Sequence, residues 1–237
     1  MTGTERAPNR LLDLGELEEP FFRRTLQRLD ELTGRESISY LHPSKRWEYP
    51  WALERARLAP GSRVLDAGCG ASIFPVYLSE LGYWVAAVDR QPPEGLAACH
   101  GAAIDYVRSD ITALPFEDQS FDAVFCISVI EHLDRDGVRT ALQELRRVAK
   151  SGARLLITTD YYEDAGAEIW FEGEDRRFRV DWAFFDEAHL RRYLLEAPGL
   201  SLEGALDLTI DWERARPLMR RFHGYPYTSV GVALVRS

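Results

Sequence analysis

The chain has 237 residues, of which 46% are hydrophobic and 28% are charged, ordinary values for a globular protein with one domain and its appendages. Its 38 acidic and 29 basic residues give a formal net charge of −9. This charge disfavours a nucleic-acid or anionic-membrane partner, because phosphates would be repelled at long range. No apolar run approaches a membrane span, and the polar amino terminus does not resemble a signal peptide. Because the three cysteines, Cys69, Cys99 and Cys126, lack metal-ligand spacing, we expect free thiols and a cytoplasmic protein.

The amino-terminal part of the chain, residues 1–58, is predicted to form a helical cap segment in front of the main domain. A helical pattern runs from Leu11 to Leu32. It is followed by an aromatic-rich segment, residues 37–51, and by a short helix predicted over residues 52–58. The aromatic side chains have two open interpretations: they shape the mouth of a site, or they pack on the outer helices of the sheet.

The stretch from Arg63 to Gly70 predicts a cradle for a nucleotide cofactor. Val64 and Leu65 form a short apolar run typical of a buried parallel strand, and Asp66 stands at its carboxyl end. Gly68 and Gly70 then allow the backbone to turn sharply and to approach a ligand without Cβ atoms in the way. A strand, a glycine turn and a following helix together form such a cradle.

Two further carboxylates indicate which cofactor is bound. A strand predicted over residues 83–88 ends in Asp89, which can accept hydrogen bonds from ribose hydroxyls. A third strand, predicted over residues 103–107, is followed by Asp110, which can accept from an adenine amino group. The dinucleotide pattern of three glycines fails here, because Ile73 takes the place of the third.

Together with the segments at residues 114–125 and 130–133, these motifs closely resemble the class I S-adenosylmethionine-dependent methyltransferases, in their small-molecule, type 11-like branch. The resemblance implies an α/β, Rossmann-like domain over residues 59–237. Its sheet would have seven mostly parallel strands with helices on both faces, and an antiparallel last strand. The remaining strands are predicted over residues 122–126, 154–159, 200–210 and 228–235.

The resemblance also implies a set of residues that bind S-adenosylmethionine. They are Asp66, Gly68 and Gly70 at the methionine end, Asp89 at the ribose, Arg90, Asp110 and Ile111 at the adenine, and Ser128 near the amine or sulfonium. The chain departs from the family at Ser72, where a third glycine is usual. We expect Ser72 to tighten the turn without abolishing binding.

His132, after the fourth strand, is the candidate general base by its position in the family. The alternative is that Glu131 and His132 form a structural signature in which His132 is hydrogen-bonded to the backbone. We favour this alternative, because the dipeptide recurs across enzymes with unrelated substrates. Some relatives bind a divalent ion through an E-x-x-E-H arrangement in this loop. Since Ser128 replaces the first glutamate here, we expect no metal dependence.

Two aromatic-rich inserts interrupt the alternation of strands and helices, at residues 160–185 and 211–227. The first leaves the sheet at the edge where α/β proteins bind ligands, so it is predicted to form a wall or lid of the substrate pocket. The alternative is a peripheral subdomain or a dimer contact. The candidate substrate contacts are Tyr162, Trp170, Phe171 and His223.

The resemblance implies an enzyme that transfers a methyl group from S-adenosylmethionine to O, N or C of a small molecule and leaves S-adenosylhomocysteine. Two alternatives stay open. One is an enzyme of this fold that uses the cofactor without methyl transfer, in a cyclase or decarboxylase-like reaction. The other is a protein methyltransferase. The sequence does not distinguish the acceptor, nor a monomer from a homodimer.

Overall fold

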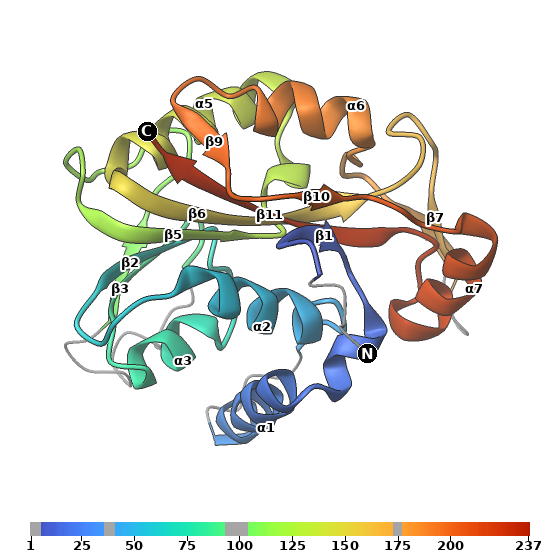
Figure 1. The fold of residues 1–237 in the computed structure, drawn as a ribbon, viewed down its shortest axis with the longest axis horizontal. Helices are drawn as coiled ribbons and strands as arrows, with labels where there is room; N and C mark the ends of the chain where they lie inside the picture. The colour runs from blue at the N-terminus through green and yellow to red at the C-terminus, as the bar shows by residue number, and fades with distance from the viewer. Residues whose placement is uncertain (1–5, 36–40, 93–103, 173–176) are drawn as a thin grey trace.

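The structure is a computed structural model that describes residues 6–35, 41–92, 104–172 and 177–237. A central sheet lies between two layers of helices (Figure 1), with the strand order β10-β1-β11-β6-β5-β2-β3-β4. Its parallel part consists of β2 (Arg63–Ala67), β3 (Trp84–Asp89), β4 (Ile104–Arg108), β5 (Phe121–Ile127) and β6 (Ala149–Tyr161). The last strand, β11 (Thr228–Arg236), pairs antiparallel with β6. The predicted α/β class and the antiparallel last strand are therefore confirmed.

The predicted count of seven strands is wrong, because the main sheet contains nine strands within the described residues. One additional strand is β1 (Asn9–Leu11), which lies between β10 and β11. The other arises because the strand predicted over residues 200–210 is divided into β9 (Leu200–Leu202) and β10 (Leu206–Asp207). Gly204, with φ of +80°, separates the two halves, so β9 pairs with β11 while β10 pairs with β1.

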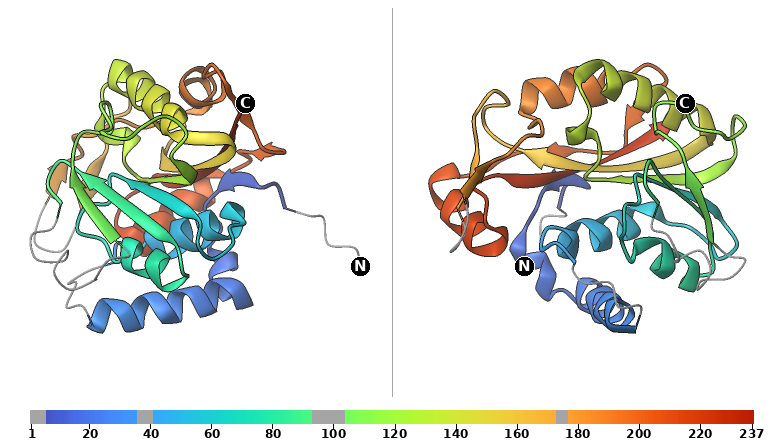
Figure 2. Two further views of the ribbon diagram at one scale, coloured as in Figure 1. Left: turned by 90° about the vertical axis from the view of Figure 1, so that its left-hand side faces the viewer. Right: turned by 180° about the vertical axis from the view of Figure 1, so that it is seen from behind.

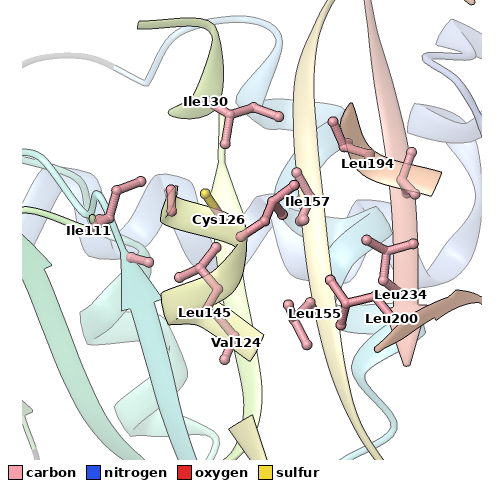
Figure 3. Close-up of a cluster of buried hydrophobic side chains, with 14 of the residues drawn as sticks. Ile111, Val124, Cys126, Ile130, Leu145, Leu155, Ile157, Leu194, Leu200 and Leu234 are labelled. Carbon is pink, nitrogen blue, oxygen red and sulfur yellow. The ribbon is translucent and has the colours of Figure 1, made fainter. Parts of the chain in front are cut away.

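One face of the sheet is covered by α5 (Arg135–Val148) and α6 (Glu187–Leu190), the latter followed by a π-helical turn (Arg191–Leu195). Figure 3 shows part of this core, in which Leu145 of α5 packs on Val124 and Leu155 of the sheet. Asp134 caps α5 by accepting a hydrogen bond from the backbone N–H of Gly137 at 2.7 Å.

The other face is covered by α2 (Lys45–Ala56) and α3 (Phe74–Glu80), and α1 (Pro20–Arg35) packs on the outside of these two helices. The helix predicted over residues 52–58 begins at Lys45 instead, so the aromatic segment is largely helical. Trp47 and Trp51 are fully buried, with ring centroids 5.7 Å apart. A Cβ atom on Gly231 of β11 would lie 2.5 Å from the Trp51 indole. Trp51 therefore packs on the sheet itself and Trp47 stacks on Trp51, whereas the second interpretation placed both side chains on the outer helices.

The predicted amino-terminal helix is also divided. The helical pattern between Leu11 and Leu32 becomes strand β1, a 3₁₀ turn (Leu14–Glu18) and α1, because Pro20 can begin a helix but not continue one. Within the described ranges, every helix falls short of the length and apolarity that a membrane crossing needs.

The two inserts lie at the same end of the molecule (Figure 2). The first contains the antiparallel pair β7 (Trp170–Glu172) and β8 (Arg177–Arg179). The second is mostly helical, because Asp211 caps α7 (Trp212–His223) through the backbone N–H groups of Glu213 and Arg214. The inserts share a small hydrophobic core of their own, formed by Ile169, Val180, Phe184, Tyr225 and Tyr227.

Candidate cofactor and active site

Two adjoining cavities open at the carboxyl ends of the parallel strands. The first has a volume of about 270 Å³ and is lined by Lys45, Asp66 and Gly70, among others. The second has a volume of about 260 Å³ and includes Asp89, Asp110, Ile111 and His132 in its lining. Gly68 and Ser128 line both cavities. One extended ligand could therefore occupy the two cavities together.

Asp66 of β2 lies in the first cavity with 3% of its surface exposed. Burial raises the pKa of its carboxyl to about 7, which Lys45 partly counteracts and Asp89 reinforces. The Oδ2 atom is buried and has no hydrogen-bond partner among the described residues. A buried acceptor without a donor costs about 1–3 kcal/mol. The site therefore fits a ligand that brings an N–H donor to this atom.

The glycine turn after β2 gives the ligand access to the backbone. Gly68 has φ of +84°, and a Cβ atom there would lie 2.5 Å from Cγ2 of Val129. Gly70 also has positive φ, of +51°, but the space beside it is open. Its backbone N–H donates to Oδ2 of Asp89 at 3.0 Å, which joins the end of β3 to the turn. The first glycine is thus required by packing and the second by backbone conformation.

Ser72, which stands where the family has a third glycine, lies at the start of α3. Its Oγ accepts a hydrogen bond from the backbone N–H of Phe74 at 3.3 Å. The N-cap position of α3 is occupied by Ile73, so Ser72 supports the turn from one residue further back.

The ends of β3 and β4 form the second cavity. The Asp89 carboxylate accepts from the backbone N–H groups of Gly70 and Gln91, the latter at 2.8 Å. The Asp110 carboxylate accepts from the backbone N–H and the hydroxyl of Thr112 at 2.9 and 2.8 Å, and these hydrogen bonds lower its pKa. Arg90 is exposed at the rim and lies near Asp110. Local hydrogen bonds thus hold both carboxylates in place.

Ser128 joins the two cavities to helix α2. Its φ is +53°, an uncommon value for a residue with a side chain, and its backbone N–H donates to the Thr158 carbonyl at 3.1 Å. The Ser128 hydroxyl donates to the carboxylate of Glu48 at 3.0 and 2.9 Å. Glu48 is fully buried and also accepts from Nζ of Lys45 at 2.7 Å and from Oγ of Ser229 at 2.8 Å.

Lys45 and Glu48 are site residues that the sequence analysis did not identify. Burial alone would raise the pKa of Glu48, but Lys45 and the two hydroxyls lower it below its ordinary value. A signal was present: the chain has two lysines, and Lys45 stands three residues before a glutamate in a strongly aromatic helix. That spacing places the pair on one helix face.

His132 lies in the lining of the second cavity, at the end of a 3₁₀ turn (Ile130–His132). Its ring centroid is 5.5 Å from that of Trp182. Neither ring nitrogen has a hydrogen-bond partner in the part of the chain that the structure describes, so the expected bond to the backbone is not found. Partial burial and then Lys45 lower the His132 pKa. The imidazole is therefore neutral near pH 7 and able to accept a proton.

Residues 65–157 match the family model described as a methyltransferase domain. Over these residues the chain is similar to the methyltransferase domains of the type 11 family. Over 108 residues it is 40% identical to the malonyl-acyl-carrier-protein O-methyltransferase of Erwinia pyrifoliae, a match that covers 45% of this chain and 40% of that protein. Over 112 residues it is 38% identical to the ubiquinone biosynthesis O-methyltransferase of Hahella chejuensis, covering 45% and 46%. These matches span less than half the length of either relative.

Solved methyltransferase structures share the fold over a longer stretch. The 1,6-didemethyltoxoflavin-N1-methyltransferase of Burkholderia thailandensis aligns with a TM-score of 0.60 and 19% identity, covering 100% of this chain and 98% of that one. The cyclase SpnF aligns with the same TM-score and 18% identity, covering 79% of each chain. At these identities the likeness shows the fold of the methyltransferase domain and not its reaction.

The four predicted substrate contacts gather away from the two cavities of the methyltransferase domain. Phe171 stacks on Phe178 with ring centroids 5.0 Å apart and lies 5.1 Å from Tyr225, whereas Trp170 is 39% exposed. The other two predicted contacts are Tyr162 and His223. None of the four is among the described residues that line either cavity.

His223, at the end of α7, is buried beside Tyr225 and Tyr227 of the hydrophobic core that the two inserts share, which we call the insert cluster. Burial lowers its pKa to about 4, and its Nε2 has no hydrogen-bond partner among the described residues. Its ring lies 6.0 Å from that of His42, which lines the first cavity. The insert cluster thus approaches the methyltransferase cavities through His42 on one side and through Trp182, against His132, on the other.

Three or more His, Cys, Asp or Glu side chains that could hold a metal ion do not gather anywhere in the described ranges. At the position of the glutamate in the metal-binding relatives, the Ser128 hydroxyl is bonded to Glu48.

Proposed function

We propose that the protein is an enzyme that transfers a methyl group from S-adenosylmethionine to O, N or C of a small-molecule acceptor. The main support is the row of strand-end carboxylates, Asp66, Asp89 and Asp110, beside two adjoining cavities. Within that row, the unpartnered Oδ2 of Asp66 fits the cofactor's ammonium group. The names of the relatives, which include ubiquinone biosynthesis, support an acceptor of low molecular weight.

Each site residue has a proposed role in this reaction. Those at the cofactor are Asp66, Gly68 and Gly70 at its methionine end, Asp89 at its ribose, Arg90, Asp110 and Ile111 at its adenine, and the Ser128 backbone near its amine or sulfonium. When bound, S-adenosylmethionine supplies a methyl group open to in-line displacement. His132 would remove the proton from the attacking atom, since its neutral ring lines the second cavity.

We propose that residues 1–58 act as a cap on the domain of residues 59–237, and that the inserts cover the acceptor. Tyr162, Trp170, Phe171 and His223 would shape this cover, which reaches the cavities through Trp182 and His42.

The remaining proposals concern partners and location. The net charge of −9 supports an enzyme that does not bind nucleic acid. We propose that it acts as a monomer or a homodimer. The buried free thiols of Cys69 and Cys126 support a cytoplasmic location. Cys99 lies outside the described residues.

Calorimetric titration with S-adenosylmethionine, S-adenosylhomocysteine and NAD tests the cofactor, and product analysis with a panel of small acceptors tests the reaction. We expect both adenosyl ligands to bind, NAD not to bind, and S-adenosylhomocysteine to accumulate in the presence of an acceptor. Tight NAD binding, or no binding of S-adenosylmethionine, would overturn the proposal. If an acceptor is converted while S-adenosylmethionine stays intact, the protein instead uses the cofactor without methyl transfer.

We also propose that the reaction needs no metal, because the Ser128 hydroxyl is bonded to Glu48 and a glutamate is missing from the ligand set of the metal-binding relatives. Turnover should survive dialysis against EDTA. Loss of turnover that magnesium restores would show that this interpretation of Ser128 is wrong.

A further inference from the structure

The ion pair between Lys45 and Glu48 lies directly behind the junction of the two cavities. Lys45 lines the first cavity, and its Nζ is 2.7 Å from Oε2 of the fully buried Glu48. Ser128 lines both cavities and donates its hydroxyl to the same carboxylate at 2.9 Å. A molecule that fills both cavities is thus separated from Glu48 by a single serine side chain.

Glu48 differs from the other buried carboxylates near the cavities in its charge. Burial raises the pKa of Asp66 and Asp160 to about 7, and raises that of Glu131 well above its ordinary value. The pKa of Glu48 is instead lowered, since Lys45, Ser128 and Ser229 all bond to its carboxylate. The pair therefore places one fixed negative and one fixed positive charge in a setting where water screens them weakly.

We propose that the opposing charges of Lys45 and Glu48 balance one another beside the cavities, so that loss of either one shifts the preference between cationic S-adenosylmethionine and the neutral product S-adenosylhomocysteine. This inference rests on the proposed function. The two ligands share the amine, carboxylate, ribose and adenine, and differ in the methyl group and its sulfonium charge. Glu48 attracts that charge and Lys45 repels it, whereas the thioether of the product responds to neither. An imbalance between the two charges would thereby change how readily the product leaves after each turnover.

The test is the ratio of the two dissociation constants in four proteins, measured by calorimetry at about pH 8.5 to keep Glu48 ionised when Lys45 is replaced. Glu48→Gln leaves an oxygen that can accept a hydrogen bond but removes the negative charge, so the preference for S-adenosylmethionine should fall about tenfold. Lys45→Gln can still donate to Glu48 but removes the positive charge, so the preference should rise by about the same factor. The double variant should return to within about threefold of the parent.

Opposite signs in the two single variants distinguish the inference from a structural effect, because damaged packing weakens both ligands together. Lys150→Gln is the matched control: it removes the chain's other lysine, which pairs with Asp122 at the far end of β5, and should leave the ratio unchanged. If Lys45→Gln does not fold, Glu48→Gln still shows whether loss of the negative charge lowers the preference for S-adenosylmethionine. The double variant then shows whether loss of the positive charge restores that preference.

Three results are decisive. An unchanged ratio in both single variants, with S-adenosylmethionine still bound, would overturn the inference and leave the proposed function intact. An equal loss of both ligands in Lys45→Gln would also overturn it, since Lys45 would then hold the carboxylate that both ligands carry. If the parent protein binds neither ligand, the proposed function itself fails.

Discussion

The strand-end cradle and the insert cluster are built in different ways. In the cradle, Asp66 and Asp89 lie at the carboxyl ends of β2 and β3, and Asp110 lies in the loop after β4. Backbone N–H groups hold Asp89 and Asp110 in place. In the insert cluster, side chains from residues 160–185 pack against side chains from residues 211–227. The cradle is thus fixed by backbone geometry, while the cluster is fixed by packing. The two regions should therefore respond to different kinds of substitution.

A methyl group added to the glycine turn should have the largest effect. Gly68→Ala places a Cβ atom 2.5 Å from Val129 at a φ of +84°, so we expect stability to fall by about 2–3 kcal/mol and S-adenosylmethionine affinity to fall more than about tenfold. Gly70→Ala is the matched control, because its surroundings are open and the strain costs about 1 kcal/mol. Denaturant unfolding and calorimetry measure both effects. Equal losses in the two variants would contradict the packing role of Gly68.

Truncation of Phe171 should affect the insert cluster and spare the cradle. Phe171→Ala removes contacts with Phe178, Tyr225 and Gly224, so we expect stability to fall by about 2 kcal/mol. Turnover with an acceptor should fall at least about tenfold, while S-adenosylmethionine affinity changes less than about twofold. Trp170→Ala, at a more exposed position, should change stability by less than about 1 kcal/mol.

The double variant of Trp170 and Phe171 separates a lid from an interface. Acceptor binding and turnover should be impaired while S-adenosylmethionine affinity moves little. Normal turnover together with weakened self-association in sedimentation experiments would assign the insert to a dimer interface.

Asp89→Ala should weaken the cradle without affecting the inserts. It removes the acceptor for the N–H groups of Gly70 and Gln91 and the proposed acceptor for the ribose hydroxyls. We expect S-adenosylmethionine affinity to fall about tenfold, or about 1.4 kcal/mol, with little change in melting temperature. Unchanged affinity in calorimetry would remove Asp89 from the site.

The last expected effect is on the pH dependence of stability. Asp160 accepts from Nε1 of Trp182 at 2.7 Å, and burial raises its pKa to about 7, above its value in the unfolded chain. The folded state therefore holds a proton that the unfolded state releases, so this contribution is present at low pH and is lost as pH rises from about 4 to about 7. Asp160→Asn should flatten the decline in stability over that range by about 1 kcal/mol per pH unit.

The pH dependence of stability can be tested in the cradle in the same way, at Asp66. Burial also raises the pKa of Asp66 to about 7, so Asp66→Asn should flatten the curve in the same direction. Denaturant unfolding of the ligand-free protein at several pH values provides the measurement. A steeper decline in either variant would contradict the raised pKa of that residue.

The cradle could be predicted from the sequence because its signals are local. An apolar run with an aspartate at its end or in the following loop predicts both a strand and a ligand-facing carboxylate. β2, β3 and β4 lie within two residues of their predicted bounds. The third strand's first predicted residue, Ala103, lies outside the described residues. The sequence does not predict that α2 begins as early as Lys45, because Pro50 interrupts the helical pattern. In the structure the helix continues through Pro50, and Trp47 and Trp51 are buried on either side of it.

Other features depend on residues far apart in the chain. Strand β1 has three residues, too few for a periodic pattern, and exists because it pairs with β11 near the carboxyl end. The side chain of Asn9 secures this pairing by accepting from the Ala233 N–H at 2.6 Å. Likewise, Glu48 reaches the site through Ser128 and Ser229, which lie 80 and 181 residues away in sequence. Local spacing cannot predict such contacts.

The central claim is that the three strand-end carboxylates bind one cofactor molecule that occupies both adjoining cavities. A crystal structure with S-adenosylhomocysteine tests this claim most directly. The account predicts the ligand's amino group within hydrogen-bond distance of Oδ2 of Asp66, its ribose hydroxyls on Asp89, and its adenine beside Asp110 and Ile111. A ligand seated elsewhere, or one that leaves Asp66 and Asp89 without contact, would contradict it.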